Sequence, residues 1–330
     1  MSGSRACRHV KAQDGDRMIQ VWKTPQILKG LVSSVPIFDG WRLSRAATGG
    51  SDSARYCYSV WLRHLSILGL HGFRVQGAKV GELGPGDSIG VGLAALLSGG
   101  SSYVGLDIVP FSAKANLQNI FRDLIGMYAA HEAIPNHREF PGIRPTLDSY
   151  AFPHHLVDYP ASDQLAAAIR SEIDNNLKQG DLIHYQVPWN SPAIIDCDSL
   201  DLIFSQAVLE HVDALEETYL AMSTWLKPGG YMSHVIDFGA HHLSPFWNGH
   251  WAYSDLQWHL VRGRREFLLN REPLSKHIQC AENAGLEILQ MINSYDDDGL
   301  PRHCLSSRFQ NFYSEDSRTR GTTLILKKCQ

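Results

Sequence analysis

The residues best suited to bind a ligand stand in one short stretch, VGELGPGDSIG, residues 80–90. Glu82 ends an apolar run and is followed by glycines at positions 84, 86 and 90. Glycines at a strand-to-helix turn let the backbone approach a ligand with no side chain in the way. The stretch is compatible with a dinucleotide site, a methyl-donor site or a tight loop, and each predicts different residues elsewhere.

The spacing of the glycines argues against a nicotinamide cofactor. A dinucleotide turn requires G-x-G-x-x-G, whereas this chain has G-x-G-x-x-x-G with an acidic residue two positions before the first glycine. Asp107 follows at the end of the next apolar run, where its carboxylate could accept both hydroxyls of a ribose. That position suits any adenosine-type ligand in a βαβ unit, so Asp107 does not separate the two cofactor classes.

The elements that position these residues alternate along the chain. Apolar runs that predict buried strands are AKVGEL, SYVGLDIV, LIHYQV, LDLIFSQ and YMSHVIDF, with amphipathic runs that predict helices between most of them. Two further runs, LEILQMINSY and TTLILKK, predict strands near the end. This alternation indicates a parallel sheet covered on both faces.

The remaining segments predict the domain organisation. We expect residues 1–75 to form an N-terminal helical cap, with breaks at Pro25 and Pro36, and residues 76–330 to form one α/β domain. Residues 133–163 are rich in Pro and His and read as an insertion, and residues 238–265 as a loop that binds the acceptor.

Composition excludes several classes of protein. The chain has 30 Lys and Arg against 34 Asp and Glu, so it lacks the basic footprint of most nucleic-acid binders. It has no apolar run long enough to span a membrane and no secretory signal. The six cysteines form no CxxC pair, which predicts neither a zinc knuckle nor a dense disulfide framework. We therefore expect a cytoplasmic protein without nucleic-acid or membrane partners; the oligomeric state is not predicted.

Four motifs in order resemble those of one enzyme family. ELGPGDS, GLDI, LDLIFSQAVLEHV and WLKPGGYMSHVI look like the successive motifs of class I S-adenosylmethionine-dependent methyltransferases. The resemblance covers roughly residues 78–240, and the terminal strand pair extends it to about residue 328. It implies a Rossmann-like, doubly wound seven-stranded sheet, mostly parallel with an antiparallel last strand. It also implies S-adenosylmethionine as cofactor and S-adenosylhomocysteine as product.

The resemblance assigns a set of donor-binding residues. Glu82 would support the methionine end of the donor, Asp107 would bind the ribose, and Ile108 would lie against the adenine. Gln186 and Val187 are the best candidates for the adenine edge, although the third strand matches the family poorly. The full predicted set is Glu82, Gly84, Gly86, Asp87, Ser88, Asp107, Ile108, Gln186, Val187, Ser205 and Gln206.

Methyl transfer is an in-line displacement at a sulfonium, and an oxygen nucleophile usually needs a base. Base candidates follow the last core strand: Asp237 at its end, and His241 and His250 on the loop beyond. We predict these three as catalytic. The spacing of His234, Asp237 and His241 could suggest a metal, but no matching acidic-Asn motif accompanies it, so none is expected.

Acceptor-binding candidates are Tyr58, His211, Trp247 and Trp251. Each also has a structural interpretation. Tyr58 could lie on a solvated helix face, and His211 could brace the start of a helix together with Glu210. The tryptophans could form a small core under a long loop instead of a stacking platform.

The sequence thus predicts a methyltransferase that acts on a small molecule, with O-methylation of a sugar or secondary metabolite favoured. A methyltransferase-fold protein that has lost catalysis and serves as a scaffold is the alternative. A nicotinamide oxidoreductase is disfavoured by the glycine spacing.

Overall fold

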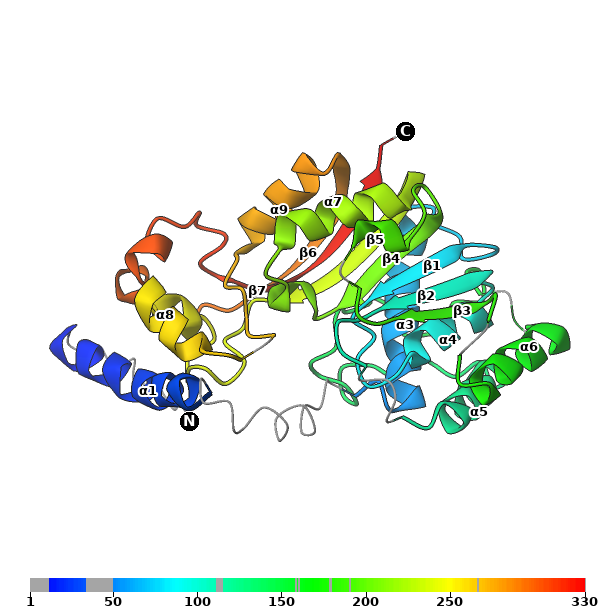
Figure 1. The fold of residues 1–330 in the computed structure, drawn as a ribbon, viewed down its shortest axis with the longest axis horizontal. Coiled ribbons are helices and arrows are strands. Elements are labelled where there is room, and N and C mark those ends of the chain that lie inside the picture. Colours follow the sequence, from blue (N-terminus) through cyan, green and yellow to red (C-terminus); the bar gives the residue numbers. More distant parts are fainter. Residues whose placement is uncertain are drawn as a thin grey trace, which may run out of the picture. The chain divides into compact units, whose positions relative to one another are not determined.

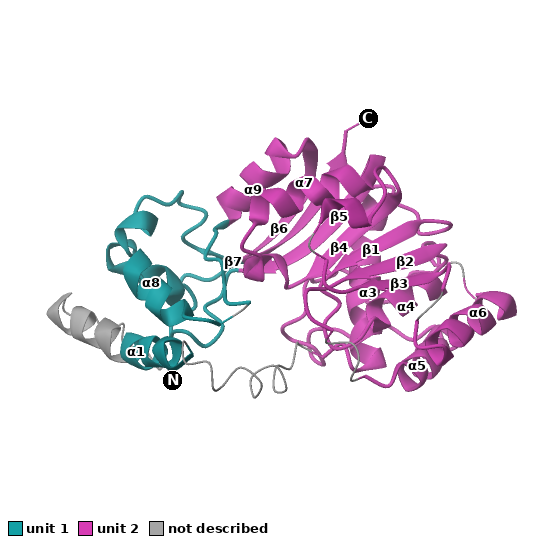
Figure 2. Cartoon of the chain, in the orientation of Figure 1, with its two compact units in different colours: residues 1–45, 238–273, 295–320 teal, residues 46–237, 274–294, 321–330 magenta. Residues whose placement is uncertain are grey.

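The computed structural model describes residues 12–33, 50–110, 115–157, 159, 161–177, 180–189, 191–265 and 267–329. The chain divides into two compact units (Figure 2). Unit 1 comprises residues 1–45, 238–273 and 295–320, and unit 2 comprises residues 46–237, 274–294 and 321–330. No helix among the described residues is long and apolar enough to cross a membrane.

Unit 2 contains a seven-stranded sheet in the order β3-β2-β1-β4-β5-β7-β6. The pairs β1–β2, β1–β4, β2–β3 and β4–β5 are parallel, and β7 pairs with β5 antiparallel. The strands are β1 Lys79–Leu83, β2 Ser102–Leu106, β3 Ile183–Gln186, β4 Leu200–Gln206, β5 Leu226–Asp237, β6 Leu286–Tyr295 and β7 Thr319–Lys328. This order confirms the predicted doubly wound sheet with an antiparallel last strand.

Helices cover both faces of the sheet (Figure 1). One face carries α3 Ala54–Leu70, α4 Gly90–Leu97 and α5 Leu117–Ala129, and α6 Asp163–Asp174 packs beside α5. The other face carries α7 Leu215–Trp225 and α9 Leu274–Asn283, which contact each other. Short 3-10 turns occur at η3 Pro192–Ile194 and η4 Leu209–His211.

The central strands and α4 are built from apolar runs because these elements are buried on all sides by the rest of the core. Four of the five β1 residues are buried, and every residue of α4 is buried. A helix that is apolar all round is stable only inside a core. The main core accordingly joins α3, α4 and α5 to the sheet.

The Pro- and His-rich insertion is held by a buried arginine of α3. Arg63 is fully buried, and its Nη1 donates to the carbonyls of Ile143 and Pro145 at 3.0 and 2.9 Å. Its Nη2 donates to the Pro135 carbonyl at 2.8 Å, and its guanidinium lies 5.0 Å from the Tyr150 ring. One side chain therefore supplies hydrogen bonds that this irregular backbone cannot form within itself.

Unit 1 contains α1 Ala12–Ser33, α8 Asp255–Arg262 and the 3-10 turns η5 Gly249–Ala252, η6 Arg302–Cys304 and η7 Ser307–Phe309. The predicted helix break at Pro25 is wrong, because α1 continues through it. Pro36 lies outside the described residues. Helix α1 packs on α8, and the buried Lys23 ammonium donates to the Ala252 carbonyl.

The division of the chain differs from the expected boundary near residue 75. Helix α3 belongs to unit 2, where it packs on the sheet, while α1 belongs to unit 1. The predicted acceptor loop, residues 238–265, falls wholly in unit 1. Residues 1–11 and 34–49 of the expected cap lie outside the described residues.

Candidate active site

The glycine turn lies at the carboxyl edge of the sheet, between β1 and α4. Gly84 and Gly86 have φ values of +68° and +74°, which side chains rarely adopt. A Cβ on Gly84 would stand 2.6 Å from Cγ2 of Val208. The positive φ and the lack of room for a Cβ atom therefore both require glycine at position 84.

The segment just before α3 is hydrogen-bonded to this turn. The Ser51 hydroxyl donates to the Pro85 carbonyl at 2.9 Å and accepts from the Ser88 N–H at 3.0 Å. Ser53, the residue that precedes α3, makes no side-chain cap bond. Ser51 instead holds the glycine turn.

Ser88 is fully buried, so its predicted contact with a ligand needs revision. Its hydroxyl donates to the Ser51 carbonyl and accepts from the Gly90 N–H. Both interactions keep Ser88 inside the turn. Asp87 is half-buried beside it, and its carboxylate lies 3.5 Å from the Gly50 nitrogen.

Glu82 is buried at the end of β1. It is 2% exposed, and its carboxylate accepts a hydrogen bond from the Tyr103 hydroxyl on β2 at 2.6 Å. Burial raises the pKa of Glu82 to about 8, opposed by the Tyr103 hydrogen bond and assisted by the charge of Asp107.

Asp107 follows β2 at the same edge of the sheet. Its Oδ1 accepts from the Ile108 N–H at 2.8 Å, while its buried Oδ2 has no hydrogen-bond partner among the described residues. Burial raises the pKa of Asp107, and N–H groups of Ile108, Val109 and Gly86 oppose that shift. A buried acceptor oxygen without a donor is unusual, and it fits a ligand that brings a hydroxyl. Ile108 is 47% exposed, so an apolar side chain stands open next to this oxygen.

The chain beyond β3 runs beside Asp107. The Asp107 N–H donates to the Gln186 carbonyl at 3.1 Å, and the Trp189 N–H donates to the Asp107 carbonyl at 3.0 Å. Gln186 is exposed and Val187 is half-buried. The backbone of these residues therefore runs beside that of Asp107, although the third strand matched the family poorly.

Ser205 and Gln206 are the last two residues of β4, and the side chain of each lies within hydrogen-bond distance of a histidine. The Ser205 hydroxyl lies 2.8 Å from Nδ1 of His234, and Oε1 of Gln206 lies 3.1 Å from Nε2 of His64. Ser205 and His234 are fully buried, so the Ser205 side chain is a core group. Gln206 is partly exposed at the edge.

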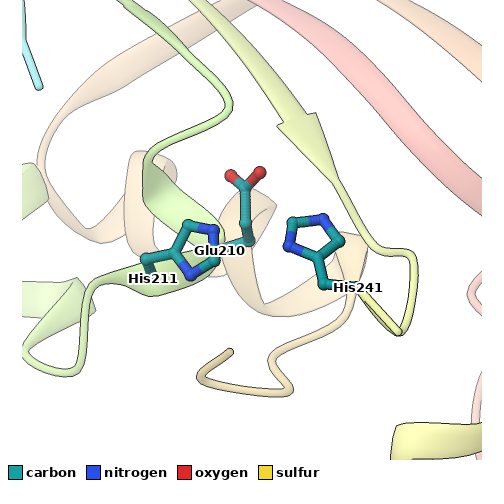
Figure 3. A group of neighbouring side chains, drawn as sticks. All are labelled: Glu210, His211 and His241. Atoms are coloured by element: carbon teal, nitrogen blue, oxygen red, sulfur yellow. The ribbon is translucent and has the colours of Figure 1, made fainter. Parts of the chain in front are cut away.

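Glu210 and His211 both lie in the short turn η4, as Figure 3 shows. Glu210 is buried, which raises the pKa of its carboxyl well above the usual range. The nearby charge of Asp237, at the end of β5, acts in the same direction, and N–H groups of Glu210 and Asp237 oppose it. Two carboxyl groups of unit 2 thus meet at this edge, while His211 is half-buried.

The three predicted bases fall in different parts of the chain. Asp237 ends β5 in unit 2, whereas His241 and His250 belong to unit 1. His241 is exposed with φ +41°, but His250 is 2% exposed with its ring 4.6 Å from that of Trp251. His250 is therefore packed inside unit 1. His234 and Asp237 point to opposite faces of β5 because they are three residues apart.

Three predicted acceptor contacts are core residues. Tyr58 is fully buried and donates to the Glu132 carbonyl at 2.7 Å. Trp251 is 1% exposed, and its indole N–H donates to the Arg271 carbonyl at 2.9 Å. Trp247 is 8% exposed and packs edge-on against Trp251. The aromatic loop forms a small core, which was the structural interpretation of these residues.

Sequence reasoning missed three residues that organise the site: Ser51, which holds the glycine turn; Tyr103, which binds Glu82; and His64, which binds Gln206. Only Tyr103 left a signal. A tyrosine in the second position of a buried strand needs a partner for its hydroxyl.

One family model matches part of the chain. Residues 154–233 match the family model described as a methyltransferase domain, a span that runs from the insertion into β5. No curated protein sequence matches the chain significantly.

Solved structures also resemble the chain. Phosphoethanolamine N-methyltransferase 2 from Haemonchus contortus, in complex with S-adenosyl-L-methionine, matches with a TM-score of 0.46 and 15% identity over 90% of this chain and 61% of that chain. A putative sarcosine dimethylglycine methyltransferase from Galdieria sulphuraria has a TM-score of 0.41 and 16% identity, over 80% and 83%. An S-adenosylmethionine-dependent methyltransferase from Mesorhizobium loti has a TM-score of 0.41 and 12% identity, over 80% and 96%.

Sheet order, the antiparallel β7, the glycine turn and the family match agree with one another. The sheet order is the one that the resemblance to class I S-adenosylmethionine-dependent methyltransferases implies, and residues 154–233 match a methyltransferase domain.

Proposed function

We propose that the chain transfers the methyl group of S-adenosylmethionine to an oxygen atom of a small molecule, a sugar or another secondary metabolite. The methyl–sulfur bond breaks as the methyl–oxygen bond forms, which leaves neutral S-adenosylhomocysteine. The proton of the acceptor hydroxyl passes to a base of the enzyme.

The unpartnered Oδ2 of Asp107 is the observation that carries the donor assignment. A ribose hydroxyl placed there would satisfy a buried acceptor that the described residues leave open. The exposed face of Ile108, with Gln186 and Val187, would border the adenine next to it. Glu82, Gly84, Gly86 and Asp87 would border the methionine end, with Ser88 as a brace inside the turn.

Asp237 and His241 are the proposed bases. Asp237 ends the strand beside the buried carboxyl of Glu210, and its negative charge helps to raise the pKa of Glu210. His241, an exposed residue of unit 1, stays in the proposed set on the sequence prediction alone. His250 is not among the proposed bases, because its side chain is buried in unit 1. Half-buried His211 remains a proposed acceptor contact.

A small-molecule acceptor fits the charge of the chain, which is slightly acidic at −4. A nucleic-acid acceptor would require a basic surface to neutralise phosphates. The scaffold alternative does not account for the Asp107 oxygen that the described residues leave without a donor, because a protein that binds no ligand there gains nothing from an unsatisfied buried group.

Calorimetric titration with S-adenosylmethionine, S-adenosylhomocysteine and NADH tests the donor assignment. We expect both sulfur compounds to bind and NADH not to bind; binding of NADH alone would overturn the proposal. D107A should weaken binding of S-adenosylmethionine by about 1–3 kcal/mol, since charge-assisted hydrogen bonds are lost. Exposed Asp123 pairs only with its neighbour Arg122 in the described structure, so D123A is the matched control and should bind normally.

Methyl transfer itself is tested by mass spectrometry of reactions with hydroxylated small molecules. A gain of one methyl group that D237N abolishes, with donor affinity unchanged, supports the base role. Donor binding without any methylated product across sugars, phenols and alcohols would favour the scaffold alternative.

A further inference from the structure

A buried polar network lies under the carboxyl end of β4. His64 of α3 is fully buried, with Nδ1 2.6 Å from the Ser233 hydroxyl on β5 and Nε2 3.1 Å from Oε1 of Gln206. All three residues belong to unit 2. Beyond His64, the side chain of Gln206 continues to the partly exposed edge of the sheet.

The chemistry of these groups fixes where the protons are. Burial lowers the pKa of His64 to about 4, so the imidazole is neutral at pH 7 and carries one N–H. The Oε1 atom of Gln206 can only accept, so the proton is on Nε2 of His64. Nδ1 is then an acceptor, and it receives the hydrogen bond of the Ser233 hydroxyl.

Because of these hydrogen bonds, Gln206 can bind a ligand only through a hydrogen-bond donor. Its carbonyl oxygen is used by His64, so its NH₂ group, which only donates, is the part that remains. The preceding residue, Ser205, pairs with Leu83 of β1, so Gln206 lies level with Gly84 of the glycine turn. That is the part of the site proposed for the methionine end of the donor.

We propose that His64 is a positioning residue that holds the Gln206 amide with its NH₂ group toward the donor's α-carboxylate. The α-ammonium group cannot use this position, because two sets of donors would face each other. The inference rests on the proposed donor site, and it adds a specific partner for one end of the ligand.

Q206L tests the contact with two donors that differ by one group. We expect S-adenosylmethionine to bind Q206L about tenfold more weakly than wild type, the loss typical of a charge-assisted hydrogen bond. Decarboxylated S-adenosylmethionine, which lacks the carboxylate, should bind both proteins within twofold. An equal loss for both ligands, or no loss for either, would overturn the proposal.

Q206E sharpens the same test. A glutamate can still accept from His64, but it would place an oxygen against the donor carboxylate. S-adenosylmethionine should then bind more weakly to Q206E than to Q206L, and decarboxylated S-adenosylmethionine should not. Tighter binding of S-adenosylmethionine by Q206E than by Q206L would contradict the proposal.

The control is Q290L. Gln290 lies on β6, and its Oε1 lies 2.8 Å from Nε2 of His71, an interaction comparable to that of Gln206 with His64. It should bind both donors as wild type does. If wild type binds neither donor, the proposed function fails; if wild type binds both and Q206L is unaffected, only the present inference fails.

The tautomer of His64 provides a direct readout that needs no activity. In ¹⁵N-histidine-labelled protein, the resonances that shift in Q206L identify His64. The structure predicts a proton on Nε2. A proton on Nδ1 would mean that the Gln206 amide is reversed and would overturn the proposal.

Discussion

The Tyr103 hydroxyl on β2 donates a 2.6 Å hydrogen bond to the buried carboxyl of Glu82 on β1. The pair joins two adjacent strands directly beneath the glycine turn. Since burial raises the pKa of Glu82 to about 8, this carboxyl is mostly protonated at pH 7 when no donor is bound.

The Glu82 pKa predicts a pH-dependent stability. Between its usual value of 4.5 and about 8, the folded protein holds a proton that the unfolded chain has released. Stability contributed by this site therefore falls as pH rises through that window. E82Q lacks the titration, so without donor it should match wild type below pH 4.5 and exceed it by roughly 3 kcal/mol at pH 7. Urea unfolding from pH 4 to pH 8 measures the difference; a gap independent of pH would contradict it.

Gly84→Ala should damage the turn in two separable ways. The positive φ costs about 1–2 kcal/mol for any other residue, and the new methyl group would clash with Val208. Gly77→Ala is the matched control, because Gly77 has φ +74° with open space around its Cβ position.

We expect both glycine variants to lose stability, and only G84A to lose donor affinity. Adding V208A to G84A should recover the part of the stability loss that comes from the clash. Thermal unfolding and calorimetric titration report the two effects; equal losses in G84A and G77A would show that the Val208 contact is unimportant.

Arg63→Met should release the insertion from α3. It would remove the donors of three backbone carbonyls that Arg63 satisfies, at a cost of roughly 3 kcal/mol or more. Arg55→Met is the comparison, because Arg55 pairs with Glu132 and Glu139 at the exposed surface. Such exposed pairs contribute about 0–1 kcal/mol. Limited proteolysis should cut R63M within residues 133–157 faster than R55M; similar rates would argue against the role of Arg63.

Trp251→Ala should act on stability rather than on acceptor binding. Its ring is buried against Phe309 and Phe312, and truncation of a buried tryptophan costs about 3–5 kcal/mol. Tyr313 is 74% exposed in the same unit, so Tyr313→Ala should change little. Thermal unfolding compares the two. A stable W251A protein with a raised KM for the acceptor would restore the stacking-platform interpretation.

The strands and the edge of the sheet were predictable because each leaves a local pattern. Apolar runs identified all seven strands, and Glu82 and Asp107 stand where two of them end. The burial of Tyr58 and Trp251 was not predictable in this way. The sequence pattern around an aromatic residue in an amphipathic or loop segment is the same whether its ring contacts a ligand or packs in a core.

Partners of buried polar groups were also beyond the sequence. His64 and Gln206 are 142 residues apart, and only the packing of α3 on the sheet brings them together. Pro25 is a different case: tertiary packing of α1 on α8 outweighs a local breaker of the helix.

The assembly of unit 1 from three separate stretches has a consequence for biosynthesis. Lys23 and its acceptor Ala252 are 229 residues apart, so α1 leaves the ribosome long before α8 exists. Until then Trp22 and Ile27 of α1 lack the Tyr253 and Trp258 rings of their core. Closing so long a loop slows folding, and it leaves apolar surface open to aggregation or chaperone binding meanwhile. Expression of this chain should therefore be more sensitive to temperature and chaperone supply than the size of its sheet domain alone implies.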